Sequence, residues 1–177
     1  GAGTLVAVID SGIAYQHPAF RNGDQSKILS IWDQSLPGGR SGRIPYGREF
    51  TRAQINEALA TENPLEIVPS IDRNGHGTRL AAIAAGNRIP EENFSGAAPE
   101  AELVIVKLKP AKKYLRDFYL FPREAEIFQE DDIMLAISYV LQCAVENQMP
   151  LSICIGLGTN MGAHRGDGPL SEFINST

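Results

Sequence analysis

Two cysteines, no long apolar run and no excess of basic residues characterise this 177-residue sequence. Cys143 and Cys154 lie in apolar stretches, which favours buried free thiols over a disulfide framework. No apolar run is long enough to cross a membrane. The net charge is −5, so the basic excess typical of nucleic-acid-binding proteins is absent. With 43% hydrophobic residues, the chain can still form one globular core.

An apolar run near the start ends abruptly in a carboxylate. Residues 5–9 read Leu-Val-Ala-Val-Ile, which is typical of a central strand in a parallel sheet. Asp10, Ser11 and Gly12 follow directly. Because α/β sheets place their chemistry at the carboxyl ends of their strands, Asp10 is a candidate functional residue. The alternative role for an isolated aspartate is a turn residue or a helix cap.

A second candidate, His76, opens a predicted helix. An Asn-Gly turn precedes it, residues 80–85 are almost all small and apolar, and a glycine follows where helices usually end. The positive end of the helix dipole favours a neutral imidazole, which can accept a proton as a general base. A structural role is the alternative for a single histidine. Asp10 offers the partner that would orient the ring.

Both motifs resemble those of the subtilisin-like serine peptidases. Residues 6–13, followed by a His-Pro pair, resemble the aspartate motif of that family. Residues 74–78, followed by small residues up to Gly86, resemble its histidine motif. The family order of Asp before His is kept. By resemblance, Asp10 and His76 are two members of a catalytic triad.

Later segments continue the resemblance across nearly the whole chain. Residues 96–103 resemble the segment that leads into the next core strand, and residues 153–158 resemble the strand that borders the substrate. The resemblance implies that Gly156, Leu157 and Gly158 bind substrate, since glycines let another backbone approach closely. The separation of 66 positions from Asp10 to His76, together with residues 46–51, is most similar to the clostridial spore-germination protease branch.

Strands and helices alternate along the sequence. Residues 27–33, 103–106 and 151–155 read as further strands, and residues 130–144 read as a core helix. This order predicts an α/β fold with a doubly wound, mainly parallel sheet and helices on both faces. No repeat or second domain is evident, so we expect residues 1–177 to form the amino-terminal portion of one subtilisin-like peptidase domain.

The block between the two motifs reads as a surface elaboration. Residues 34–49 are rich in Gly, Pro, Ser and Arg, which is typical of an exposed loop. A capping box at Thr51 predicts a short helix through Ala60, and residues 61–72 return the chain to the histidine. Many subtilisins carry a carboxylate for structural calcium just after His-Pro, but Ala19 stands there. We therefore expect no metal ion at that position, and no cofactor.

Residues 107–129 mix basic and aromatic side chains. Such a mixture can bind nucleic acid, but the acidic total and the lack of any nucleic-acid motif argue against it. In the resembled family this segment helps to form the edge that pairs with substrate, and a solvated surface excursion is the alternative. We expect neither nucleic acid nor a membrane as a partner.

The third member of the triad is missing from the sequence. There is no Gly-Thr-Ser-x-Ala and no Gly-x-Ser-x-Gly, and by resemblance Ser11 is not the nucleophile. Asn160 lies too early to be the oxyanion asparagine, and His164 reads as exposed and non-catalytic. We expect the serine and the oxyanion asparagine beyond residue 177. The parent protein is then a serine endopeptidase, and these 177 residues alone are inactive.

Two other readings remain open. A pseudoprotease would keep the fold and act as a protein-binding module, and only the absent serine decides this. A hydrolase using Asp10 and His76 as metal ligands lacks a clear third ligand. The resemblance implies a protein or peptide substrate, allows a propeptide, and suggests a secreted or spore-associated bacterial location. Because part of the domain is missing, we expect uncovered surfaces and self-association.

Overall fold

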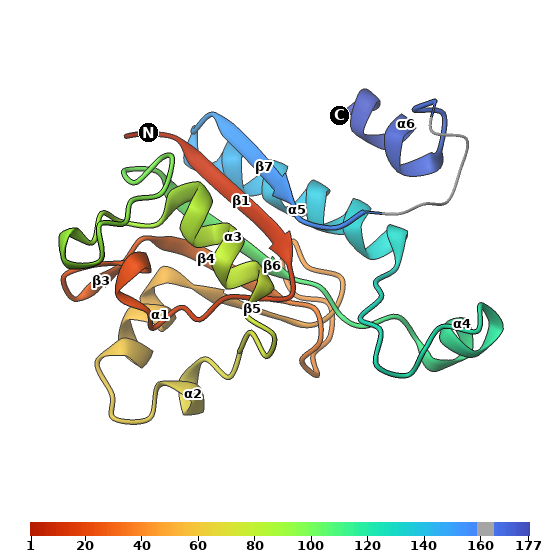
Figure 1. Cartoon of the computed structure of the whole chain (residues 1–177), viewed down its shortest axis with the longest axis horizontal. Coiled ribbons are helices and arrows are strands. Elements are labelled where there is room, and N and C mark those ends of the chain that lie inside the picture. The colour runs from red at the N-terminus through yellow and green to blue at the C-terminus, as the bar shows by residue number, and fades with distance from the viewer. Residues whose placement is uncertain (159–164) are drawn as a thin grey trace.

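A computed structural model of the chain describes residues 1–158 and 165–177. Its main sheet has five strands in the order β5-β4-β6-β1-β7 (Figure 1). All neighbours are parallel except β5, which runs antiparallel to β4. The prediction of a mainly parallel sheet is therefore confirmed. The strands are β1 (Leu5–Asp10), β4 (Ile28–Asp33), β5 (Arg48–Thr51), β6 (Glu102–Lys107) and β7 (Leu151–Ile155).

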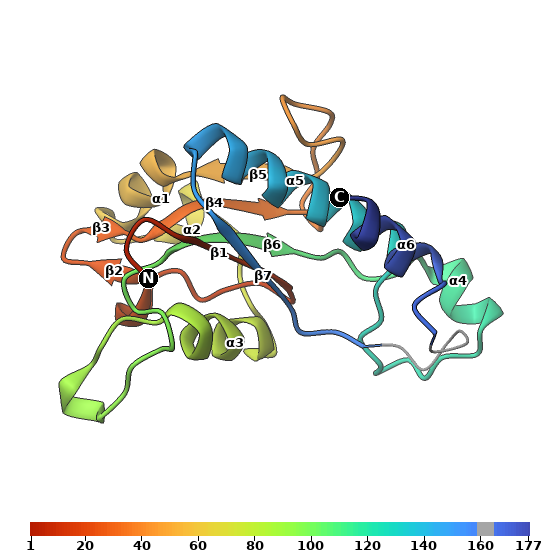
Figure 2. The same cartoon turned by 90° about the horizontal axis from the view of Figure 1, so that it is seen from above.

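Helices cover both faces of this sheet (Figure 2). All six residues of β1 are buried, which explains why its sequence is continuously apolar. Val6 and Val8 join the core on the side of α3 (His76–Ala85). The alternate residues of β1 join a second core on the side of α5 (Glu130–Asn147). Asp10 follows the register of Val6 and Val8, so the strand repeat of two places it on the α3 face.

Helix α5 begins where the sequence predicts it, and the Pro169-Leu170 pair, typical of a helix start, opens α6 (Pro169–Ser176). Three acidic residues occupy the first turn of α5, where the helix dipole favours negative charge. Its apolar stripe, which includes Ile137 and Val140, packs against the sheet. Both cysteines are free thiols, as predicted, but only Cys143 is buried, whereas Cys154 is half-buried.

The block between β4 and α3 is more deeply anchored than a surface elaboration. Thr51 and Gln54 form the predicted capping box at the start of α1 (Arg52–Leu59). After α2 (Pro64–Ile67), the chain does not stay on the surface. Val68 accepts a hydrogen bond from the Tyr15 hydroxyl at 3.1 Å, and the buried Ser70 hydroxyl donates to Asp33 at 2.7 Å. This return segment is fixed to the carboxyl edge of the sheet.

Residues 108–129 form an arm that projects from the same edge (Figure 1). The arm is closed at its base by a hydrogen bond from Ala111 N to Ile127 O, 2.8 Å long. It carries the short helix α4 (Lys113–Phe118) and five exposed apolar or aromatic side chains. They are Tyr114, Phe118, Tyr119, Leu120 and Phe121.

Short elements complete the described part of the chain. A small hairpin is made by β2 (Arg21–Asn22) and β3 (Gln25–Ser26). Two 3-10 turns, η1 (Pro18–Phe20) and η2 (Pro90–Glu92), lie on either side of α3 in the sequence. Across residues 1–158 and 165–177, no helix has the length and apolar character needed to cross a membrane.

Candidate active site

Asp10 and His76, 66 positions apart in the sequence, meet at the carboxyl edge of the sheet. The Nδ1 atom of His76 lies 2.8 Å from Oδ1 of Asp10. The carboxylate is buried, with 1% of its side chain exposed, whereas 45% of the His76 side chain is exposed. The result is a rigid buried acceptor behind an imidazole that solvent can reach.

The Asp10 carboxylate is fixed from its own turn. Its Oδ1 also accepts a hydrogen bond from the backbone N–H of Ser11 at 2.7 Å. Its Oδ2 is buried and has no hydrogen-bond partner among the residues that the structure describes. A carboxylate can only accept from Nδ1–H, so Asp10 favours the tautomer whose Nε2 carries the lone pair. Nε2 is then the nitrogen that can take a proton from another group.

A third residue, Asp72, joins the two motifs and was not singled out from the sequence. Its Oδ1 accepts from the Ser11 hydroxyl at 2.9 Å and from Gly75 N at 3.1 Å. Its Oδ2 accepts from Thr78, from the backbone N–H at 2.9 Å and from the hydroxyl at 2.6 Å. Burial raises the pKa of the Asp72 carboxyl, but these hydrogen bonds outweigh it and hold the pKa below its usual value.

A known protein family matches the chain over most of its length. The model of the subtilase family matches residues 1–118, which is more than half of the chain. The chain belongs to the subtilase family.

Relatives and a solved structure of this family are similar to the chain over different lengths. The Arabidopsis thaliana "Subtilisin-like protease SBT1.9" is 30% identical over 123 residues, covering 60% of this chain and 16% of that protein. The Streptococcus pyogenes "C5a peptidase" is 32% identical over 114 residues, covering 62% of this chain and 9% of that protein. The chain thus matches less than a fifth of these relatives' lengths.

The solved structure is the Clostridium perfringens CspB protease. It is 29% identical to this subtilase chain, with a TM-score of 0.80. The similarity covers 99% of this chain and 33% of CspB. The predicted subtilisin-like fold, and the resemblance to a clostridial protease of this family, are confirmed by this match.

Two glycines of the subtilase chain allow its three segments to approach one another. A Cβ on Gly77 would lie 2.3 Å from Gly12 O, because the first turn of α3 presses against the Asp10 turn. A Cβ on Gly156 would lie 2.0 Å from Leu80 Cδ1 and 2.4 Å from Asp10 Oδ2. Real Cβ atoms do not approach this closely, so a side chain at 77 would meet the backbone of the Asp10 turn, and one at 156 would displace the Leu80 and Asp10 side chains.

The three residues predicted to bind substrate lie in different environments. Gly156 lies against the Asp10–His76 pair, and Leu157 is half-buried against the core on the α5 side. Gly158 is exposed, and an added Cβ there would meet nothing within 4 Å. Their role in substrate binding stays a prediction. Asn160 and His164 lie outside the described residues.

Serine side chains near the pair have structural partners. The single Ser11 hydroxyl proton has Asp72 Oδ1 at 2.9 Å and Asn74 Oδ1 at 3.0 Å as acceptors, and the Ser11 oxygen accepts from Gly77 N at 3.0 Å. The strand pattern of residues 151–155 predicts that Ser152 is buried, but Ser152 is exposed. Ser152 pairs with Val6 on the α3 face of the sheet, where an open hollow lies between β7 and α3. Within the described residues, no cluster of three or more His, Cys or carboxylate groups could hold a metal ion.

Proposed function

We propose that this chain supplies the Asp and His of an Asp-His-Ser triad in a serine endopeptidase. The observation that carries the proposal is the 2.8 Å contact between His76 Nδ1 and the buried Asp10 Oδ1. Membership of the subtilase family and the similarity to the CspB protease support it. Protein or peptide chains are then the substrates, and a propeptide is a further candidate partner.

The chemistry assigned to this pair is proton transfer. A serine hydroxyl of the parent protein would attack the peptide carbonyl while His76 Nε2 accepts its proton. Asp10 would hold the imidazole in the required tautomer and stabilise its protonated form. His76 would then return the proton to the leaving amine. Oxyanion donors would stabilise the negative charge of the tetrahedral intermediate.

We place both the nucleophile and the oxyanion asparagine outside these 177 residues. The chain alone therefore carries a proton acceptor without a nucleophile and does not hydrolyse peptides. On this proposal residues 1–177 are the amino-terminal portion of a single peptidase domain. The low coverage of the relatives is consistent with a longer parent, since the chain spans 33% of CspB.

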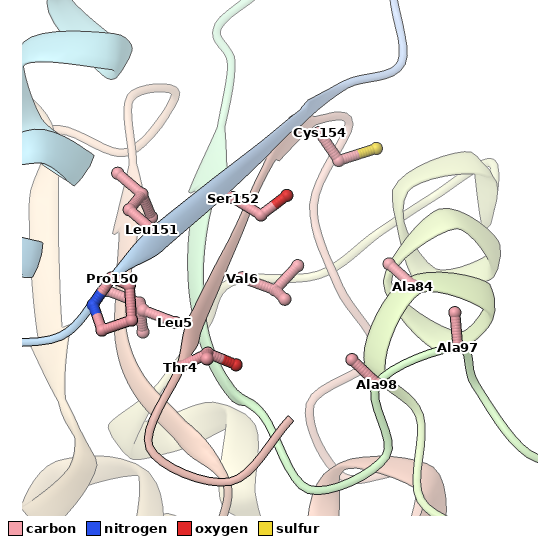
Figure 3. A pocket seen from close by; sticks show the side chains of 10 residues that line it. All are labelled: Thr4, Leu5, Val6, Ala84, Ala97, Ala98, Pro150, Leu151, Ser152 and Cys154. Carbon is pink, nitrogen blue, oxygen red and sulfur yellow. The ribbon is translucent and has the colours of Figure 1, made fainter.

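An uncovered apolar hollow supports the idea that further structure packs here. It measures about 430 Å³ and lies between β7 and α3, where Val6, Ala84 and Cys154 line it (Figure 3). The outer edge of β7 has no strand partner in the described sheet. Exposed strand edges and apolar hollows favour association, so we expect the isolated chain to dimerise or aggregate. Light scattering that shows a uniform monomer would contradict this.

Hydrolysis of an unfolded protein substrate tests the proposed activity. The parent protein should cleave it, its His76→Ala variant should not, and the 177-residue chain should also be inactive. Cleavage should persist in a metal chelator, because the pair acts as a base and its orienting group rather than as metal ligands. Cleavage by the isolated chain, or equal cleavage by the His76→Ala variant, would refute the assignment.

A further inference from the structure

The segment leading into α3 carries Asp72, and several hydrogen-bond donors surround its carboxylate. Asp72 receives four hydrogen bonds from three residues, and these residues belong to both candidate catalytic motifs. Ser11 follows Asp10 directly, whereas Gly75 and Thr78 flank His76. One side chain therefore links the turn that carries the carboxylate to the helix that carries the imidazole.

The Asp72 side chain also caps the amino end of α3, although Asp72 lies three residues before the N-cap residue Gly75. Gly75, the N-cap of α3, has no side chain to offer, and its φ of 75° lies in the left-handed region. Asp72 Oδ2 instead accepts from Thr78 N in the first turn, at 2.9 Å. Its negative charge lies at the positive end of the α3 dipole, which stabilises the helix start where His76 stands.

The partners of Asp72 are tied in turn to the Asp10 loop. The Thr78 hydroxyl donates to Asp72 and accepts from Ala14 N at 2.9 Å. The Ser11 hydroxyl donates to Asp72 and accepts from Gly77 N at 3.0 Å. Each hydroxyl thus links a backbone N–H to the Asp72 carboxylate, and for Ser11 a second acceptor, Asn74 Oδ1, lies 3.0 Å away. An asparagine would turn an NH₂ group toward two of these donors.

We propose that Asp72 is a positioning residue, whose ionised carboxylate sets the distance and orientation between Asp10 and His76. This inference deepens the proposed function and rests on it where the rate of reaction is concerned. The upstream anchors of the segment are consistent with such a role. Ser70, two residues before Asp72, is buried and donates to Asp33 at the end of β4.

The Nδ1–H proton of His76 gives a readout that is independent of peptide hydrolysis. A proton shared between an imidazole and a carboxylate gives a strongly deshielded NMR signal, which is lost when the contact loosens and the proton exchanges with water. We expect the parent protein to show this signal and its Asp72→Asn variant to lose it while remaining folded by circular dichroism. Asp24→Asn, which changes an exposed aspartate outside the site, is the matched control and should keep the signal.

Rate measurements in the parent protein test the same claim. A misplacement of about 1 Å can lower a rate by about 100-fold, so Asp72→Asn should lower kcat by roughly 10-fold to 100-fold with little change in KM. Thr78→Val removes one hydroxyl donor at nearly constant volume and should lower kcat in the same way. Thr78→Ser keeps the hydroxyl and should restore most of the rate.

The outcomes separate this inference from the proposed function. An inactive wild-type parent would count against the proposed function, yet the NMR signal would still decide the role of Asp72. If Asp72→Asn does not fold, Thr78→Val and Ser11→Ala provide the same comparison with smaller changes. A folded Asp72→Asn variant that keeps both the signal and the wild-type kcat would overturn the proposal.

Discussion

Opposite charges lie against the two ends of helix α3, and we expect the amino end to serve the proposed chemistry and the carboxyl end to serve stability. At the amino end, the Asp72 carboxylate accepts backbone and hydroxyl donors beside His76. At the carboxyl end, the buried Lys27 ammonium donates to Ala85 O at 2.5 Å and Pro99 O at 2.7 Å. Both charges complement the helix dipole. Only the amino end presents a reactive side chain to solvent.

The charges at the two ends are also held differently. Lys27 is almost fully buried, and its third acceptor, Asn87 Oδ1 at 3.0 Å, completes a closed set of oxygens. The Asp10–His76 pair instead combines a buried acceptor with a half-exposed ring. We therefore expect changes at the amino end to affect the reaction rate and changes at the carboxyl end to affect stability.

The largest effect should come from Asp10→Asn. The amide cannot replace a carboxylate that orients Nδ1–H and stabilises imidazolium, so the parent protein should lose about 10⁴-fold in kcat. Because the amide has nearly the same volume, the free energy of unfolding should change far less. Steady-state kinetics and urea unfolding of the same variant measure both quantities. An unfolding midpoint that collapses together with the rate would remove the contrast between the two ends.

Lys27→Met should give the opposite pattern. It leaves Ala85 O, Asn87 Oδ1 and Pro99 O without their shared donor, and each unsatisfied buried acceptor is costly. We expect the free energy of unfolding to fall by about 2–4 kcal/mol. The kcat of the folded parent variant should change by less than a factor of about three. A large loss of kcat at unchanged stability would show that this end also controls the chemistry.

Gly156→Ala tests how closely the residue that follows β7 approaches the Asp10–His76 pair. The new methyl would overlap Leu80 and Asp10, and overpacking of this kind costs about 1–3 kcal/mol. Gly158→Ala is the matched control, since an added Cβ there meets nothing within 4 Å. Thermal unfolding of the two variants provides the comparison. Equal melting temperatures would mean that Gly156 does not press against the pair as described.

The smallest expected effect is the pH dependence that Lys27 confers. Burial lowers the pKa of the Lys27 ammonium to about 8 from its ordinary value of 10.5, with the nearby Glu102 opposing the shift. Between these two values the unfolded chain holds a proton that the native protein lacks, so stability rises with pH. Below pH 8 the cost of burying the charge is fully present.

We expect the stability difference between wild type and Lys27→Met to shift by roughly 1–2 kcal/mol in favour of wild type between pH 8 and pH 10. Urea unfolding of both proteins across this range measures it. A flat difference would show that Lys27 keeps its ordinary pKa in the folded state.

Most of the fold could be predicted from local patterns. The apolar runs that become β1, β6 and β7, and the stripe of α5, are continuous in sequence and are set by burial. The antiparallel strand β5 was not predicted, because it has only four residues and one of them is buried. Its pairing with β4 depends on a contact that no local pattern encodes.

The candidate site, like the fold, could be predicted only in part from the sequence. Asp10 and His76 lie in motifs with strong local signals, a strand end and a helix start. Asp72 was missed because its partner Ser11 lies 61 positions away, beyond the return segment that brings it into place. The only local signal was an aspartate three residues before the glycine that precedes His76, which is typical of an Asx turn or a helix start.

The most direct test of the central claim is fluorophosphonate labelling of the parent protein, followed by mapping of the adduct by mass spectrometry. The probe reacts with a serine only when a base activates it. Our account predicts one labelled serine beyond residue 177. Labelling should be lost in His76→Ala and strongly slowed in Asp10→Asn. The absence of labelling in folded, fully processed wild-type protein would contradict it and would favour a pseudoprotease that binds its partner without cleavage.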